Sequence, residues 1–146
     1  MSATTHPTAL FSGLTSRAVS GALAGIAGGI VYGMLLVMMG MLPVIATLVG
    51  SESAIVGALV HLVISAGVGA LFGVVVPATR LGVLLGAGAV YGLVWWVLGP
   101  QVILPLWLGR PPFTTDAGAW MILMGHIIYG LFTAAALFGI RRYARS

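Results

Sequence analysis

The sequence predicts an all-α integral membrane protein with four transmembrane helices arranged as two tandem helical hairpins. Three observations support this fold class: a very apolar composition, four apolar segments of membrane length, and an internal repeat. Of the 146 residues, 60% are hydrophobic and only 5% are charged, whereas soluble domains carry roughly 25% charged residues. Lipid is therefore the expected surrounding of most of the chain, and nucleic acid is excluded as a partner.

Four apolar segments each approach the ~20 residues needed to cross a hydrocarbon core ~30 Å thick. They cover residues of about 18–40, 53–76, 81–103 and 117–140. We interpret residues 1–146 as a single membrane domain with short tails. The chain contains no cysteine, so disulfides and thiolate chemistry are excluded.

The charges predict the topology. The two acids, Glu52 and Asp116, lie in the connections after the first and third segments, together with Arg110 alone. The remaining arginines precede the first segment, separate the second from the third, or follow the fourth: Arg17, Arg80, Arg141, Arg142 and Arg145. By the positive-inside rule, both termini face the cytoplasm of a prokaryotic inner membrane.

The second half of the chain repeats the first. VYGMLLVMMGMLPVIATLVG (31–50) aligns without gaps on VYGLVWWVLGPQVILPLWLG (90–109), and each copy then reaches a histidine, His61 or His126. The units cover about 18–77 and 81–141. Two spans per unit keep the orientation the same, so the predicted pseudo-two-fold axis runs along the membrane normal.

Small residues recur every four positions on the segments and predict close helix packing, because backbones in lipid associate through van der Waals contact. The first segment carries Gly21, Gly25, Gly29 and Gly33, the third carries Gly88 and Gly92, and the second carries Ser53, Gly57, His61, Ser65, Gly69 and Gly73.

Prolines follow the first and third segments. Pro43 in one repeat, and Pro100 with Pro105 in the other, lack the amide donor of a helix interior. We expect each repeat to break there and to continue as an interfacial helix, with a re-entrant segment as the alternative. Trp95 and Trp96 lie deeper, and we expect them to face lipid or a second subunit of a homo-oligomer or larger membrane complex.

The histidines are the main site hypothesis. His61 lies nine residues after Glu52 and His126 ten after Asp116, which places both about 13 to 15 Å below the helix ends. Ionisable residues at that depth are costly and point to function.

Each histidine has a tyrosine and a glycine of its own repeat at similar depth: Tyr32 with Gly33, and Tyr91 with Gly92. We expect each tyrosine hydroxyl to bond the histidine of its repeat. The plainest interpretation is interhelical hydrogen bonding alone. A sharper one has His61 and His126 ligate a b-type haem or a similar macrocycle, with the two glycines making room for the ring.

Two further interpretations stay open. The histidines and tyrosines could line an oligomeric channel or transporter for protons, a small solute or a metal ion. Cu(I) could instead bind the imidazoles together with methionine thioethers: Met34, Met38 and Met41 fall on one helix face, and Met121 and Met124 precede His126 on the fourth segment.

Catalysis has little support, since no carboxylate lies within a span and no nucleophile motif is present. The sequence therefore predicts a non-enzymatic accessory or structural subunit, with the haem between the paired histidines as its cofactor hypothesis and the oligomeric conduit as the alternative function.

The run VLGPQVILPLWLGRPPF followed by GHIIYG resembles small bacterial inner-membrane proteins of the YagU-like kind. The resemblance covers chiefly residues 90 to 130. It implies a multi-span membrane protein without an established reaction, and it adds emphasis to Gly125, His126 and Tyr129.

Overall fold

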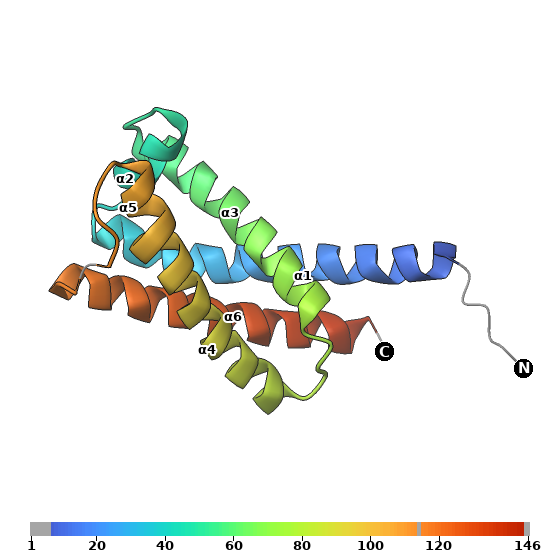
Figure 1. Cartoon of the computed structure of the whole chain (residues 1–146). Helices are drawn as coiled ribbons and strands as arrows, with labels where there is room; N and C mark the ends of the chain where they lie inside the picture. The colour runs from blue at the N-terminus through green and yellow to red at the C-terminus, as the bar shows by residue number, and fades with distance from the viewer. Residues whose placement is uncertain (1–6, 114, 145–146) are drawn as a thin grey trace, which may run out of the picture.

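The computed structural model describes residues 7–113 and 115–144, and the regular structure in these ranges is helical (Figure 1). Its elements in chain order are α1 (Pro7–Met38), α2 (Leu42–Ala46), η1 (Thr47–Val49), α3 (Ala54–Val75), α4 (Leu81–Leu98), η2 (Gly99–Ile103), α5 (Leu104–Trp107) and α6 (Ala117–Tyr143).

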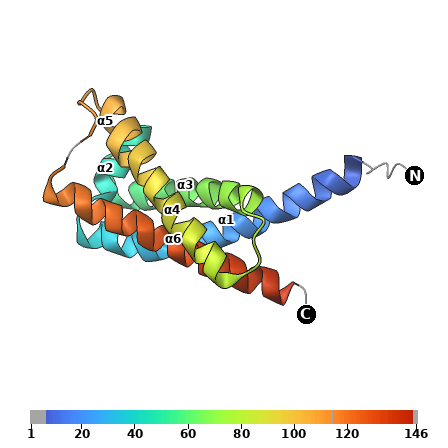
Figure 2. The same cartoon turned by 60° about the horizontal axis from the view of Figure 1, so that its bottom comes forward.

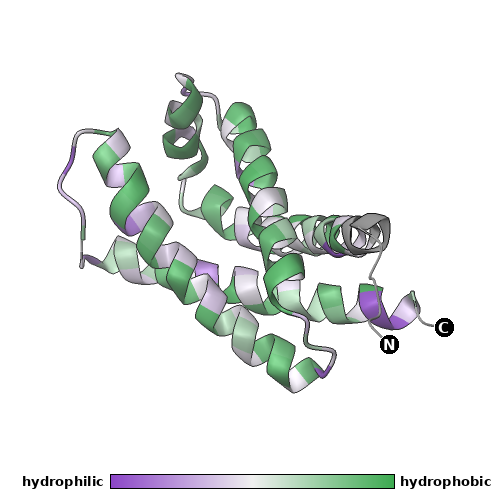
Figure 3. Cartoon of the chain, turned by 45° about the vertical axis from the view of Figure 1, so that its right-hand side comes forward, coloured by the Kyte–Doolittle hydropathy of each residue, from purple (hydrophilic) through white to green (hydrophobic). Residues whose placement is uncertain are grey.

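Four helical stretches in the described ranges are long and apolar enough to cross a membrane: Gly13–Met38, Ala54–Val75, Leu81–Trp107 and Ala117–Tyr143. Hydrophilic residues gather near the helix ends and in the connections, whereas the helix middles are mainly hydrophobic (Figure 3). The prediction of an all-α chain with four helices able to span a membrane is confirmed, which supports a multi-pass membrane protein in contact with lipid. The duplication and the cytoplasmic position of the termini stay predictions.

The four long helices form two hairpins that meet along one interface. α1 packs against α3, α4 packs against α6, and α1 also packs against α6 to join the hairpins. The start of α1, the end of α6 and the α3–α4 connection lie at one end of the bundle, here called the terminal end (Figure 1). α2 and α5 lie at the opposite end, here called the loop end (Figure 2).

Glycines allow the helices of each hairpin to approach closely, as their four-residue spacing predicted. A Cβ atom on Gly25 of α1 would collide with the Ser65 carbonyl and with Gly69 of α3. In the other hairpin, a Cβ atom on Gly92 of α4 would collide with the backbone of His126 on α6. Backbone contact of this kind supplies association energy that lipid-facing apolar surface does not.

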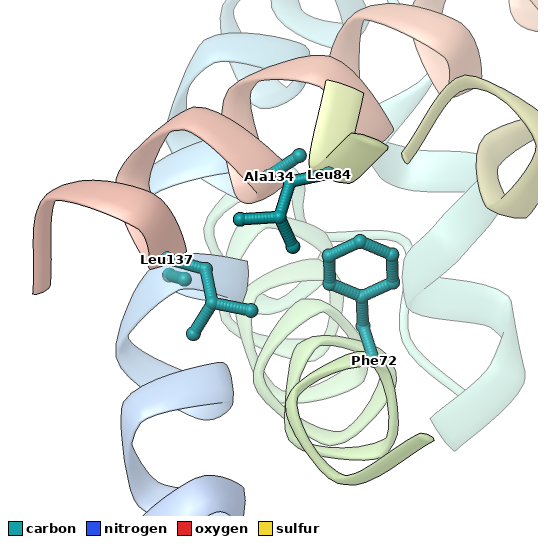
Figure 4. Packing of buried hydrophobic residues seen from close by; sticks show 5 residues of the cluster. Phe72, Leu84, Ala134 and Leu137 are labelled. Carbon is teal, nitrogen blue, oxygen red and sulfur yellow. The ribbon is translucent and has the colours of Figure 1, made fainter. Parts of the chain in front are cut away.

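A fully buried cluster joins all four long helices toward the terminal end. Ala24, Phe72, Leu84, Ala134 and Leu137 are each 0% exposed, and every long helix supplies at least one of them (Figure 4). The cluster holds the two hairpins together on the side of the histidines that faces the terminal end.

The expected break occurs in the first repeat. α1 ends at Met38, Gly40 adopts a positive φ of 65°, and Pro43 then stands in the first turn of α2. Proline suits that place because an amide in the first helical turn has no partner within the helix. α2 packs back against α3, where Gly57 has no side chain to obstruct the Leu42 carbonyl.

The expected break in the second repeat was wrong. A π-helical turn, Gly99–Ile103, joins α4 to α5 without interrupting the helical path. Its closing bond runs from the Leu104 amide to the Gly99 carbonyl. Pro100 and Pro105 each occupy a first-turn position in their segment, so the widened turn accommodates both missing amide donors.

Candidate functional site

Three rings from three helices meet in the half of the bundle nearer the loop end. Tyr32 of α1 contacts His61 of α3 edge-on, with 5.4 Å between ring centroids, and contacts His126 of α6 at 4.9 Å. The Tyr32 ring also packs on Gly125, where even a Cβ atom would overlap it. The predicted neighbourhood of the two histidines and Tyr32 is therefore present.

His61 of α3 forms a hydrogen bond to α1. Its Nε2 atom lies 2.9 Å from the carbonyl oxygen of Gly29 on α1, and the side chain is only 8% exposed. Because a carbonyl oxygen can only accept, Nε2 donates and a neutral ring leaves Nδ1 as an acceptor. The expected bond from the Tyr32 hydroxyl to His61 was wrong: the two rings meet edge-on, and the hydroxyl makes no hydrogen bond among the described residues.

His126 uses one nitrogen and keeps the other available. Nδ1 donates to the Ile122 carbonyl one turn earlier on α6, over 2.9 Å. Nε2 has no hydrogen-bond partner in the part of the chain that the structure describes. In the neutral ring this Nε2 is an acceptor.

Two other tyrosines tie the hairpins together. Tyr91 of α4 donates to the Val68 carbonyl over 2.8 Å, and Tyr129 of α6 donates to the Ser65 carbonyl over 2.8 Å. The expected bond from Tyr91 to His126 was wrong, since the hydroxyl reaches across to α3 in the other repeat. Both bonds end on backbone carbonyls of α3: one is that of Ser65 in the small-residue stripe, and the other is that of Val68, next to Gly69 of that stripe.

A cavity of about 230 Å³ lies beside these rings. All four long helices and both proline-containing segments border it, and its wall is mainly apolar. The polar side chains at the wall are Tyr32, His61, Ser65, His126 and Tyr129. We call this space the intramembrane cavity.

No family model, curated protein or solved structure matches the chain. What the intramembrane cavity can bind is therefore inferred from the residues of its wall alone.

The residues do not fit a haem between His61 and His126. A Cβ atom on Gly33 would lie 3.5 Å from Cδ2 of the His61 ring, and Gly92 abuts the α6 backbone, so protein fills the space that the macrocycle would need. The Tyr32 ring contacts both imidazoles. A cavity of about 230 Å³ is also smaller than the ~300–1,000 Å³ of most ligand pockets.

The structure does not assemble the residues of the copper hypothesis. Met41 borders the intramembrane cavity, whereas the other four methionines are exposed on the outer surface: Met34 (57%), Met38 (84%), Met121 (47%) and Met124 (62%). Within residues 7–113 and 115–144, no group of three histidine, cysteine or acidic side chains could hold a metal ion. His61 and His126 alone provide fewer ligands than protein metal sites normally use.

The expectation that Trp95 and Trp96 face lipid or a second subunit was wrong. Trp95 borders the intramembrane cavity, and Trp96 donates from Nε1 to the Ala119 carbonyl over 3.1 Å while stacking on Trp120. Both rings therefore face protein, which removes the tryptophan argument for a homo-oligomer.

Proposed function

We propose that this multi-pass membrane protein binds one small, mainly apolar molecule bearing a hydroxyl group in the intramembrane cavity. The observation that carries the proposal is His126, which borders the cavity and keeps Nε2 as an acceptor. Ligand pockets are commonly apolar with a few polar groups that orient the ligand, and the wall described above has this composition.

The size of the cavity limits the ligand. An apolar cavity of about 150 Å³ accepts benzene, so about 230 Å³ accommodates a benzene ring with a short substituent. A phenolic hydroxyl would donate to His126 Nε2, and the Tyr32 hydroxyl, which makes no hydrogen bond within the described residues, could donate to the phenolic oxygen. Trp95 would supply a stacking surface.

Ligand entry from the bilayer follows from the position of two wall residues. Ile64 of α3 is 45% exposed and Ile103 of η2 is 53% exposed, and both border the intramembrane cavity. The extensive helix contacts are those of α1 with α3, α4 with α6 and α1 with α6. The α3–α4 side is the less tightly packed one, so an apolar ligand can arrive there without crossing water.

The test compares 4-propylphenol with propylbenzene, a pair that differs only in the hydroxyl. Tryptophan fluorescence of the detergent-solubilised full chain should change saturably with 4-propylphenol, and Trp95→Phe should remove most of that change. A hydrogen bond worth about 1 kcal/mol predicts roughly fivefold tighter binding of the phenol.

His126→Leu should abolish this preference while propylbenzene still binds, because leucine keeps the wall apolar. Equal affinity of the two compounds for the unmodified protein would contradict the hydroxyl specificity. The absence of saturable binding for both would contradict the proposed function.

A further inference from the structure

The η2–α5 segment, residues 99–107, borders the intramembrane cavity but packs little against the long helices. The extensive contacts of η2 and α5 are with each other and with α4, and η2 makes a smaller contact with α6. The corresponding α2 of the first repeat packs against α3 instead. Four residues of the η2–α5 segment line the cavity: Gly99, Pro100, Ile103 and Leu104. One side of the cavity wall is therefore attached to the bundle mainly through the end of α4.

The end of α4 is held in place just before this segment begins. Trp96 donates from Nε1 to the Ala119 carbonyl of α6 over 3.1 Å, and its ring stacks on Trp120. Three residues later, Gly99 has a ψ of −83°, outside the usual helical range, and a Cβ atom there would meet nothing within 4 Å. Pro100 then has no amide to donate to the Trp96 carbonyl. The backbone can therefore turn at Gly99 without displacing α4.

A hydrogen bond from outside the segment ties η2 to the connection that precedes α6. The Gln101 carbonyl accepts from the Phe113 amide over 2.9 Å. Pro105 leaves this carbonyl without the amide that would bind it four residues later in an α-helix. Phe113 is the non-glycine residue of the described ranges with a positive φ, 63°, a left-handed conformation that is strained for a residue with a side chain. One hydrogen bond is thus opposed by backbone strain of comparable size.

We propose that the η2–α5 segment is a lid on the intramembrane cavity, which turns at Gly99 and is held closed by the bond from Phe113 to Gln101. This inference rests on the proposed function for what the lid admits, but not for the motion itself. Ile103 of the lid borders the cavity and is 53% exposed, so opening connects the cavity with the bilayer. A π-helical turn suits this place, because such turns inside helices are frequent at functional sites.

Two variants of Phe113 test how the lid is held closed. Phe113→Gly and Phe113→Ala both remove the exposed ring, but only glycine adopts a positive φ without strain. Relief of this strain should make the open lid roughly fivefold rarer in Phe113→Gly than in Phe113→Ala. Both variants keep the backbone amide that bonds Gln101. The alanine variant is therefore the matched control.

Stopped-flow tryptophan fluorescence with 4-propylphenol measures ligand exchange in the detergent-solubilised full chain. We expect the association and dissociation rate constants to be both about fivefold lower in Phe113→Gly than in Phe113→Ala. The Kd should be equal in the two variants, because a lid changes the rates in both directions alike. Equal rate constants, or a changed Kd with only one rate altered, would overturn the lid.

Spin-label distances measure the motion without a ligand, and the chain has no native cysteine to interfere. One labelled pair joins Leu106→Cys on the lid to Val49→Cys on η1, and both positions are 58% exposed. The control pair joins the exposed positions Val90→Cys on α4 and Val63→Cys on α3. The distance distribution of the lid pair should be narrower in the Phe113→Gly background than in Phe113→Ala, and that of the control pair should be the same in both. An identical lid-pair distribution in the two backgrounds would overturn the lid.

The two measurements separate the lid from the proposed function. If neither Phe113 variant binds 4-propylphenol saturably, the proposed function is contradicted and the spin-label distances alone decide whether the lid moves. If both variants bind it with equal rate constants, the cavity remains the binding site and the lid is overturned.

Discussion

The Nε2 atom of His61 on α3 donates a 2.9 Å hydrogen bond to the Gly29 carbonyl on α1. His126, the residue at the matching place in the predicted second repeat, instead bonds the backbone of its own helix, borders the intramembrane cavity and leaves Nε2 without a hydrogen bond among the described residues. The two histidines therefore have different roles: His61 joins two helices, and His126 offers an acceptor to a ligand.

Replacing His61 should destabilise the fold. We expect His61→Leu to lower the free energy of unfolding by roughly 0.6–1.7 kcal/mol, the range of interhelical hydrogen bonds in membranes. Reversible unfolding in mixed micelles measures this change. His126→Leu, which removes only a bond within α6, is the matched control and should cost less. An equal loss in both variants would contradict the division of roles.

Tyr129 and Tyr32 also have different roles, because only the Tyr129 hydroxyl forms a hydrogen bond between helices. Tyr129→Phe removes the bond to Ser65 and should cost about 0.6 kcal/mol. Tyr32→Phe removes a hydroxyl without a hydrogen bond in the described residues and should leave stability nearly unchanged, because the ring contacts with both histidines remain. The same micelle unfolding assay distinguishes the two. A larger loss for Tyr32→Phe than for Tyr129→Phe would show that the hydroxyl contacts are assigned wrongly.

The glycine contacts provide a test within one helix. A Cβ atom on Gly69 of α3 would collide with the backbone of Gly21 and Gly25, whereas a Cβ atom on Gly67 meets nothing within 4 Å. Gly69→Ala should therefore destabilise the protein by about 1–3 kcal/mol, as overpacking does. Gly67→Ala should be neutral or slightly stabilising, since alanine favours a helix. Similar melting temperatures for the two variants would rule out the close α1–α3 contact.

The orientation predicted from the arginines can be measured by cysteine labelling, because the chain has no native cysteine. Thr79 lies in the α3–α4 connection and Ser53 lies just before α3, and both are exposed. An impermeant thiol reagent applied to intact cells should label Ser53→Cys but not Thr79→Cys, and should label both after lysis. The reverse pattern in intact cells would overturn the positive-inside assignment.

The sequence predicted the spans and the packing of the hairpins because both depend on simple patterns. Apolar length alone determines where a chain can cross the bilayer, and glycines four residues apart on α1 and α3 mark the faces that meet. The depth of His61 and His126 followed from the rise of a helix, which is why both histidines were found near Tyr32.

Side-chain direction was harder to predict, for a physical reason. Around a membrane helix the lipid-facing and buried sides are both apolar, so the periodicity that separates core from solvent in a soluble helix carries little information. Trp95 and Trp96 were therefore expected to face lipid or a second subunit, although both face other parts of the same chain. Hydrogen-bond partners were also missed, because the tyrosines and His61 bind backbone carbonyls that no residue pattern identifies.

The sequence gives no sign that the helix continues through Pro100. Proline normally interrupts a helix interior, and nothing in the sequence shows that a π-helical turn at Gly99–Ile103 would accommodate it. The consequence is geometric: this turn brings Ile103, and α2 brings Ile45, to the wall of the intramembrane cavity.

Photoaffinity labelling tests the central claim, binding inside the intramembrane cavity, most directly. An alkylphenol carrying a diazirine on its alkyl chain is crosslinked to the full-length protein, and the modified residues are mapped by mass spectrometry. We predict labels on wall residues of several elements, such as Ile45, Ile64, Ile103 and Ile122, that disappear with excess 4-propylphenol. Labels confined to lipid-facing residues such as Val63, and unaffected by that competitor, would contradict the claim.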